Sequence, residues 1–107
     1  MTLPAAYELS VVIPAYNEET IICQTVQAIT DDLAARGITH EILVVDDGST
    51  DHTKEQVQGL VGRMGSHLRL VQTHHQGKGG AVRSGVLAAR GAFILFMDAD
   101  HSTRIEE

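Results

Sequence analysis

Two carboxylates, Asp98 and Asp100, are separated by one residue and directly follow the apolar residues 93–97. A short apolar run that ends in acidic residues predicts a buried β-strand whose carboxyl end opens into a polar site. Carboxylate oxygens are hard ligands, and a pair at this spacing suits Mg²⁺ or Mn²⁺ bound to phosphate oxygens. The same spacing also fits a strand that ends in a solvated acidic turn, so the pair alone leaves both interpretations open.

Acidic residues also follow two earlier apolar runs, and the three acidic loops together contain Glu18, Asp46, Asp47, Asp98 and Asp100. If these strand ends converge, five carboxylates repel one another unless a cation or hydrogen-bond donors compensate. Convergence of the strand ends therefore favours a divalent metal bound by Asp98 and Asp100. The alternative is that the loops fan outward and each acid is solvated or caps a helix, as we expect for Asp51.

Residues 77–80 form a Gly-Lys-Gly-Gly segment that we expect near the start of a helix. Backbone N–H groups, a helix N-terminus and the Lys78 ammonium all favour a bound phosphate. The segment matches neither a Walker A loop nor a dinucleotide-binding fingerprint. A turn that needs glycine backbone angles explains it equally well from the residues alone. The six histidines have no zinc-site spacing, and we interpret them as surface residues, with only His101 near a ligand.

The elements that must position these loops alternate along the chain. We predict strands at 9–13, 41–45, 68–73 and 93–97, the first ending at Pro14, and helices at 20–36, 51–64 and 81–90. The third helix is expected to bury Val82, Val86 and Ala89. The pattern predicts an α/β fold: a Rossmann-like, three-layer α/β/α parallel sheet with the third strand near an edge.

With strand order 3-2-1-4, ligands would bind at the carboxyl ends of the strands, where the order reverses. Residues 14–18 would then face residues 98–100, with Asp46 and Asp47 beside them. Tyr16 lies just after the first strand, where its ring would either stack on a base or cover the loop.

Composition limits the class of partner and the cellular setting. Fourteen acidic against eight basic residues give a net charge of −6, which argues against non-specific nucleic-acid binding. The single cysteine, Cys23, excludes an internal disulfide and fits a cytoplasmic, reducing environment. No apolar run approaches the ~20 residues of a membrane span. We therefore expect one soluble cytoplasmic domain.

Four segments, at residues 11–19, 41–51, 77–83 and 98–100, resemble the family 2 glycosyltransferases in sequence and in order. That family has a GT-A fold and uses nucleotide-diphospho-sugars. The run Gly-Lys-Gly-Gly-Ala-Val-Arg at 77–83 looks most like the polyprenyl (dolichyl) phosphate β-glucosyltransferase branch. Dolichyl phosphate mannose synthases are similar in the first, second and last segments.

The resemblance implies a nucleotide-sugar site that comprises Pro14, Tyr16, Glu18, Val45, Asp46, Asp47, Lys78, Arg83, Asp98, Ala99 and Asp100. By the same resemblance, Val45 and Asp47 would hold the base, with Asp47 accepting a hydrogen bond from it. Asp98 and Asp100 would hold Mg²⁺ or Mn²⁺ against the diphosphate. Lys78 and Arg83 would contact phosphate. No catalytic residue is assigned within the chain.

The resemblance also implies partners. UDP-glucose is the favoured donor and GDP-mannose the alternative, with polyprenyl phosphate or another acceptor for the full-length protein at the cytoplasmic face of a membrane. Family members continue well beyond Asp100, whereas this chain has seven further residues. We therefore expect residues 1–107 to be the N-terminal, donor-binding part of a GT-A fold, which binds nucleotide and metal weakly without useful transfer. An uncovered sheet edge would favour self-association into a homo-oligomer.

Three other functions use similar residues. An Asp-x-Asp phosphatase of the haloacid dehalogenase type would use Asp98 as a nucleophile, but that family carries its acidic motif on the first strand. A receiver-like signalling domain would carry its acidic doublet on the first strand, whereas Asp46 and Asp47 follow the second. A non-catalytic nucleotide-binding module is the third alternative.

Overall fold

A computed structural model describes residues 6–99, which form one parallel sheet of four strands in the order β3-β2-β1-β4. The elements in chain order are β1 (Tyr7–Ala15), α1 (Ile22–Ala35), β2 (His40–Asp47), α2 (Thr53–Met64), a 3₁₀ turn η1 (Gly65–His67), β3 (Leu68–Thr73), α3 (Lys78–Ala88) and β4 (Gly91–Phe96). This confirms the predicted fold class and strand order, including the edge position of β3.

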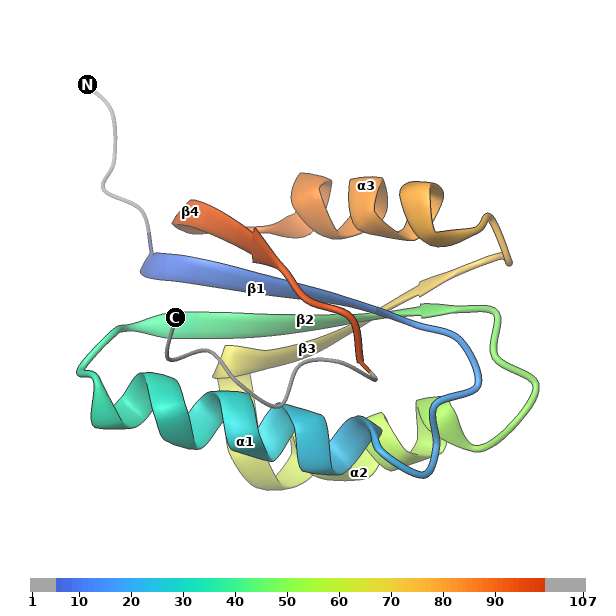
Figure 1. Ribbon diagram of the computed structural model, residues 1–107, viewed down its shortest axis with the longest axis horizontal. Helices are drawn as coiled ribbons and strands as arrows, with labels where there is room; N and C mark the ends of the chain where they lie inside the picture. Colours follow the sequence, from blue (N-terminus) through green and yellow to red (C-terminus); the bar gives the residue numbers. More distant parts are fainter. Residues whose placement is uncertain (1–5, 100–107) are drawn as a thin grey trace.

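The sheet is the middle of three layers, with α3 on one face and α1 and α2 on the other (Figure 1). Alternate residues of each inner strand serve the two faces. The larger core, beneath α1 and α2, contains Val11, Ile13, Ile22, Val26, Ile29, Leu33, Ile42, Val44, Val57, Leu60 and Leu68. None of the helices within residues 6–99 has the length and apolar character needed to cross a bilayer.

The prediction that the first strand ends at Pro14 is wrong, because β1 continues to Ala15. The Val12 carbonyl accepts a hydrogen bond from the Met97 N–H, so Val12 presents its backbone groups toward β4. Pro14 lies two residues on and faces the same side. The β1–β4 register ends at Val12 and Phe96, so the missing N–H of Pro14 falls where the ladder with β4 has ended.

Helix α3 begins at Lys78, three residues earlier than predicted, and it packs on the sheet through Ala81 and Gly85. The expected apolar face of Val82, Val86 and Ala89 is therefore wrong. The reason is distance: a Cβ atom on Gly85 would collide with Val12 Cγ1 and lie 3.1 Å from Val45 Cγ2. The helix approaches the sheet too closely for larger side chains at these two positions.

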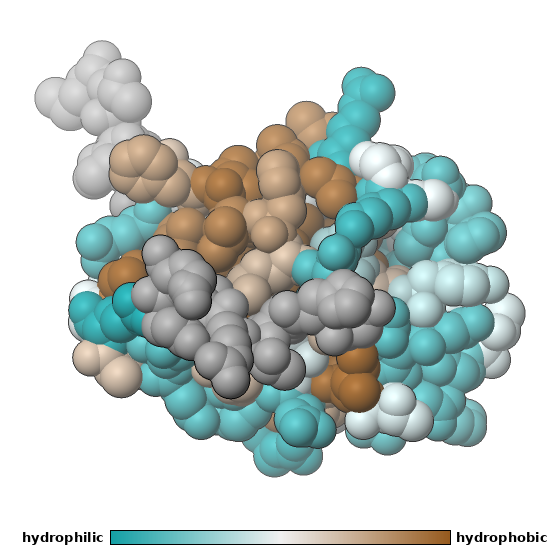
Figure 2. Space-filling view, viewed as in Figure 1, coloured by the Kyte–Doolittle hydropathy of each residue, from teal (hydrophilic) through white to brown (hydrophobic). Residues whose placement is uncertain are grey.

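The prediction that the fourth apolar strand is buried is also wrong. Within residues 6–99, strand β4 is an edge strand of the sheet, and Phe93 and Phe96 are 73% and 51% exposed. Figure 2 shows the hydrophobic surface that gathers over this part of the molecule. A continuous apolar run identifies a strand, but its burial depends on which elements lie beside it.

A buried carboxylate connects all four strands at the opposite end of the sheet from the acidic loops. Glu41 of β2 is fully buried and accepts hydrogen bonds from Ser10 Oγ at 2.6 Å and from Arg69 Nη2 at 2.8 Å. It also accepts the Arg90 N–H at 2.6 Å, just before β4. Burial by itself raises the pKa of Glu41, but these hydrogen bonds outweigh burial and hold the pKa below its usual value.

Candidate functional site

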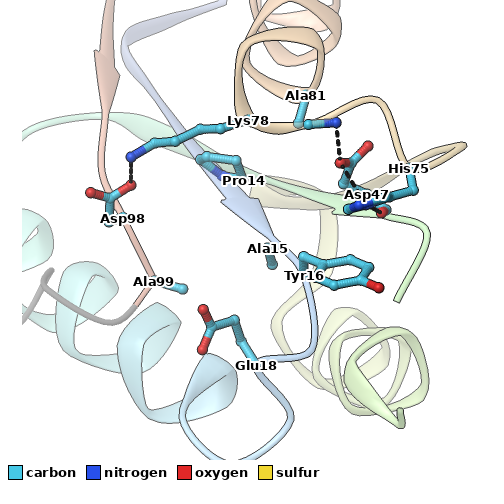
Figure 3. Close-up of a pocket in the computed structure, with 11 residues that line it drawn as sticks. Pro14, Ala15, Tyr16, Glu18, Asp47, His75, Lys78, Ala81, Asp98 and Ala99 are labelled. Carbon is cyan, nitrogen blue, oxygen red and sulfur yellow. Dashed lines mark hydrogen bonds and ion pairs between the residues drawn. The ribbon is translucent and has the colours of Figure 1, made fainter. Parts of the chain in front are cut away.

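A pocket of about 300 Å³ lies at the carboxyl ends of β1, β2 and β4, against the start of α3. It is lined by Pro14, Ala15, Tyr16, Glu18, Asp47, His75, Gly77, Lys78, Ala81, Asp98 and Ala99 (Figure 3). This is the edge at which an open parallel sheet binds ligands, because the loops after adjacent strands diverge there.

Seven of the residues singled out in the sequence line this pocket: Pro14, Tyr16, Glu18, Asp47, Lys78, Asp98 and Ala99. Val45, Asp46 and Arg83 are not among the lining residues. Val45 is buried against Val12 and Ala81, beneath α3. Asp46 is buried and accepts the Ser49 N–H at 3.3 Å. Asp100 lies outside the described residues, as does His101.

The loop after β1 is connected to the loop after β2. Asn17 has a left-handed backbone with φ of 56°, and its Oδ1 accepts the Thr50 N–H at 2.8 Å. The Glu18 N–H donates to Thr53 Oγ1 at 2.9 Å, at the start of α2. These bonds hold the turn that carries Tyr16 and Glu18 at the pocket. Asp51 Oδ1 accepts the Thr53 N–H at 2.9 Å, but His52 occupies the N-cap position of α2, so the expected capping role of Asp51 is wrong. Asp51 bonds the first helical residue from one position before the cap.

Asp47 organises the loop between β3 and α3. Its side chain is only 5% exposed, and the carboxylate accepts hydrogen bonds from Thr73 Oγ1 at 2.6 Å, Gln76 N at 2.9 Å and Gly77 N at 2.8 Å. Burial by itself raises the pKa of Asp47, but the hydrogen bonds from Gln76, Thr73 and Gly77 hold the pKa below its usual value. The carboxylate therefore sits ionised at the N-terminus of α3.

His75 is a pocket residue that was interpreted from sequence as an ordinary surface histidine. Its ring lies 4.2 Å from that of Tyr16, centroid to centroid, with an interplanar angle of 32°. Its Nδ1 lies 3.4 Å from Asp47 Oδ2. The sequence feature that points to a pocket role is its position, since His75 follows the carboxyl end of β3 by two residues. The two rings form an aromatic wall at one end of the pocket (Figure 3).

Lys78 and Asp98 form an ion pair at the other end of the pocket (Figure 3). Lys78 is the first residue of α3, and Asp98 follows β4 by two residues. The next residue, Ala99, is anchored by its carbonyl, which accepts a hydrogen bond of 2.8 Å from Thr25 Oγ1 of α1. The end of β4 is thereby fixed to both helical layers.

The pocket contains the type of donor atom, carboxylate oxygen, that a hard divalent cation requires. Asp98 and Glu18 both bring carboxylates to the pocket. Carboxylate oxygens are the protein ligands that Mg²⁺ and Mn²⁺ prefer. Within residues 6–99, no group of three or more His, Cys, Asp or Glu side chains is arranged to hold a metal. Asp98 and Glu18 each supply a carboxylate of the right type, and the described residues alone do not complete a metal site.

Residues 10–106 match the glycosyl transferase family 2. Dolichyl-phosphate beta-glucosyltransferase ALG5A of Trichomonas vaginalis is 38% identical over 97% of this chain and 34% of its own length. This chain thus spans about a third of that relative.

Two solved structures share the fold. The mannosyltransferase PcManGT from Pyrobaculum calidifontis, in complex with GDP-Man and Mn²⁺, has a TM-score of 0.77 and 29% identity over 88% of this chain and 28% of its own. TarS (residues 1–349) of S. aureus, in complex with UDP, has a TM-score of 0.72 and 31% identity over 87% and 27%. The chain belongs to glycosyl transferase family 2, and its sheet and helices have the GT-A architecture of these enzymes.

Proposed function

We propose that residues 1–107 are the donor-binding part of a family 2 hexosyltransferase, which holds a nucleotide-diphospho-sugar together with a divalent metal. UDP-glucose is the favoured donor and GDP-mannose the alternative. The whole transferase would act on polyprenyl phosphate, such as dolichyl phosphate, at the cytoplasmic face of a membrane. The resemblance to a dolichyl-phosphate beta-glucosyltransferase supports the glucose and the acceptor.

The single observation that carries this proposal is the polarity of the pocket. One end has the tilted, contacting rings of Tyr16 and His75, and the other has the Lys78 ammonium and the start of α3. A nucleoside diphosphate has the same two-part character, with a flat base at one end and anionic phosphates at the other. Aromatic rings favour the base, and a helix N-terminus with a lysine favours the phosphates.

The chemistry of transfer would develop negative charge on the departing nucleoside diphosphate. Lys78 is positioned to stabilise that charge, and the buried Asp47 keeps the loop before Lys78 in place. A bound Mg²⁺ or Mn²⁺ would supply further charge neutralisation at the diphosphate. Asp98 would hold that ion, with Asp100 as the second ligand implied by the family resemblance. The Mn²⁺ in the mannosyltransferase complex supports this role.

Titration calorimetry with UDP, UDP-glucose and GDP-mannose, each with and without Mn²⁺, tests the proposal. We expect binding that strengthens with Mn²⁺, and we expect Asp98→Asn to lose the metal dependence. Asp31→Asn is a matched control, because Asp31 is exposed on α1, lies outside the pocket lining and accepts a hydrogen bond from Gln27 Nε2. Equal nucleotide binding with and without Mn²⁺ in the wild type would refute the metal assignment.

A non-catalytic nucleotide-binding role is the second candidate, because the rings of Tyr16 and His75 and the Lys78 ammonium would bind a nucleotide whether or not sugar transfer follows. We expect the isolated chain to bind donor without useful glucose transfer to dolichyl phosphate. Robust transfer by the purified chain would exclude this candidate. Covalent labelling of Asp98 by a phosphate mimic would instead favour an Asp-x-Asp phosphatase.

A further inference from the structure

The ion pair of Lys78 and Asp98 joins two residues that the proposed function assigns to different parts of the ligand. Lys78 was expected to contact phosphate and Asp98 to contact metal, yet here they contact each other across the pocket (Figure 3). Their side chains are 66% and 40% exposed. Both groups are therefore accessible to an incoming ligand, and neither is locked by burial.

The charges around the pocket explain the pairing. Three carboxylates, those of Glu18, Asp47 and Asp98, line it. Asp47 is satisfied by backbone and hydroxyl donors. Among the described lining residues, Lys78 is the one with a permanent positive charge. A lysine ammonium on a flexible stem has no fixed fork of donors, so it exchanges partners easily.

We propose that Lys78 is a tethered counter-cation for Asp98, which competes with the divalent metal until a diphosphate draws the ammonium away. This rests on the proposed function for the identity of the metal and the diphosphate. A metal ion and an ammonium at the same carboxylate repel each other, so metal alone binds weakly. A diphosphate at the start of α3 provides Lys78 with a new anionic partner and frees Asp98 for the metal.

The consequence is positive coupling between the two ligands. By thermodynamic reciprocity, a diphosphate that strengthens metal binding is itself bound more tightly when metal is present. Lys78→Gln removes the ammonium, and its expected effects on the two ligands differ in sign. The metal alone should bind more tightly, the diphosphate should bind less tightly, and the coupling between them should shrink.

The primary experiment measures Mn²⁺ binding by electron paramagnetic resonance in the absence of nucleotide. We expect Lys78→Gln to raise the affinity for Mn²⁺ by about threefold to tenfold, the range of a partly exposed ion pair of roughly 1 kcal/mol. Lys78→Arg keeps the charge and should stay near the wild-type affinity. Lys54→Gln is the matched control, because Lys54 is the other lysine and lies on α2, outside the pocket lining.

The Asp98→Asn background makes the test specific. There, Lys78→Gln should leave the remaining Mn²⁺ affinity unchanged, since the carboxylate for which the ammonium and the metal compete is gone. An equal gain in that background would mean that only general charge repulsion was relieved, and would overturn the proposal. An unchanged or weaker Mn²⁺ affinity of Lys78→Gln in the native background would overturn it as well.

Addition of UDP separates this proposal from the proposed function. We expect UDP to raise the Mn²⁺ affinity of the wild type more than that of Lys78→Gln. If Lys78→Gln gains Mn²⁺ affinity through Asp98 but neither protein binds UDP, the competition between Lys78 and the metal for Asp98 stands, and the proposed function fails. If UDP binds with Mn²⁺ but the two proteins show the same coupling, the proposed function stands and the exchange fails.

Discussion

The side-chain carboxylate of Asp47 accepts a hydrogen bond of 2.8 Å from the backbone N–H of Gly77, which lies immediately before α3. The bond links the end of β2 to the start of the helix that carries Lys78. Together with the Gln76 N–H, it places a negative charge at the positive end of the α3 dipole. Asp47 thus shapes the pocket through the backbone.

Asp47→Asn should destabilise the domain by about 1–3 kcal/mol, because an amide group would replace one accepting oxygen with a donor in a buried network. The free energy of unfolding in urea measures this. Asp31→Asn, an exposed substitution on α1, should change it by less than about 0.5 kcal/mol. Asp47→Asn should also weaken UDP binding. Equal stability of the two variants would contradict the network.

Acid should destabilise the domain through Glu41 and Asp47, whose pKa values are both lowered in the folded state. A lowered folded pKa contributes stability above the unfolded value of about 4, and the contribution is lost as pH falls through the folded pKa. The free energy of unfolding should therefore fall as the pH drops below about 4 and through the folded pKa values, which lie lower still. In Asp47→Asn the fall should be shallower, and an identical slope would argue against this assignment.

Glu41→Gln should lower the free energy of unfolding by about 3 kcal/mol, since it removes the charge partner of Arg69 and one acceptor of the Ser10 and Arg90 bonds. Urea denaturation measures the loss, with the exposed Glu55→Gln as its control. Because Glu41 anchors the turn before β4, hydrogen exchange should also accelerate at the Gly91 amide. Slow exchange at Gly91 in the variant would show that Ser10 alone holds this turn.

Gly85→Ala and Gly59→Ala should have opposite effects on stability. A Cβ on Gly85 collides with Val12, so Gly85→Ala should cost about 1–3 kcal/mol. A Cβ on Gly59 meets nothing within 4 Å in the middle of α2, so Gly59→Ala should add about 0.4–1 kcal/mol. Thermal unfolding of both variants checks the sign. A neutral Gly85→Ala would mean that α3 moves away from the sheet at little cost.

The isolated chain should self-associate through β4, because this edge strand exposes Phe93 and Phe96. Sedimentation velocity should show association that increases with concentration. Phe93→Ser should shift the distribution toward monomer, while its far-ultraviolet circular dichroism should match the wild type, since Phe93 is largely exposed. A wild type that stays monomeric at high concentration would rule out this association.

Much of the fold was predictable because hydrophobic periodicity is a local property. Ile22, Val26, Ile29 and Leu33 are spaced four, three and four residues apart, which places them on one helix face, and all four are buried in α1. The alternation of strands and helices then required parallel strands with crossovers on both faces. The errors at Pro14 and β4 arose because ladder partners and neighbouring layers are not local.

The features of the pocket divide in the same way, into those set by local sequence and those set by contacts between distant residues. The sequence by itself determined which carboxylates, glycines and lysine follow the strands, and parallel strands bring those loops to one edge. Only the tertiary structure decided that Asp47 binds the backbone before α3, that the His75 ring contacts that of Tyr16, and that Lys78 pairs with Asp98. These contacts join residues of different loops, and their partners depend on how closely α3 and β4 approach the ends of β1 and β2.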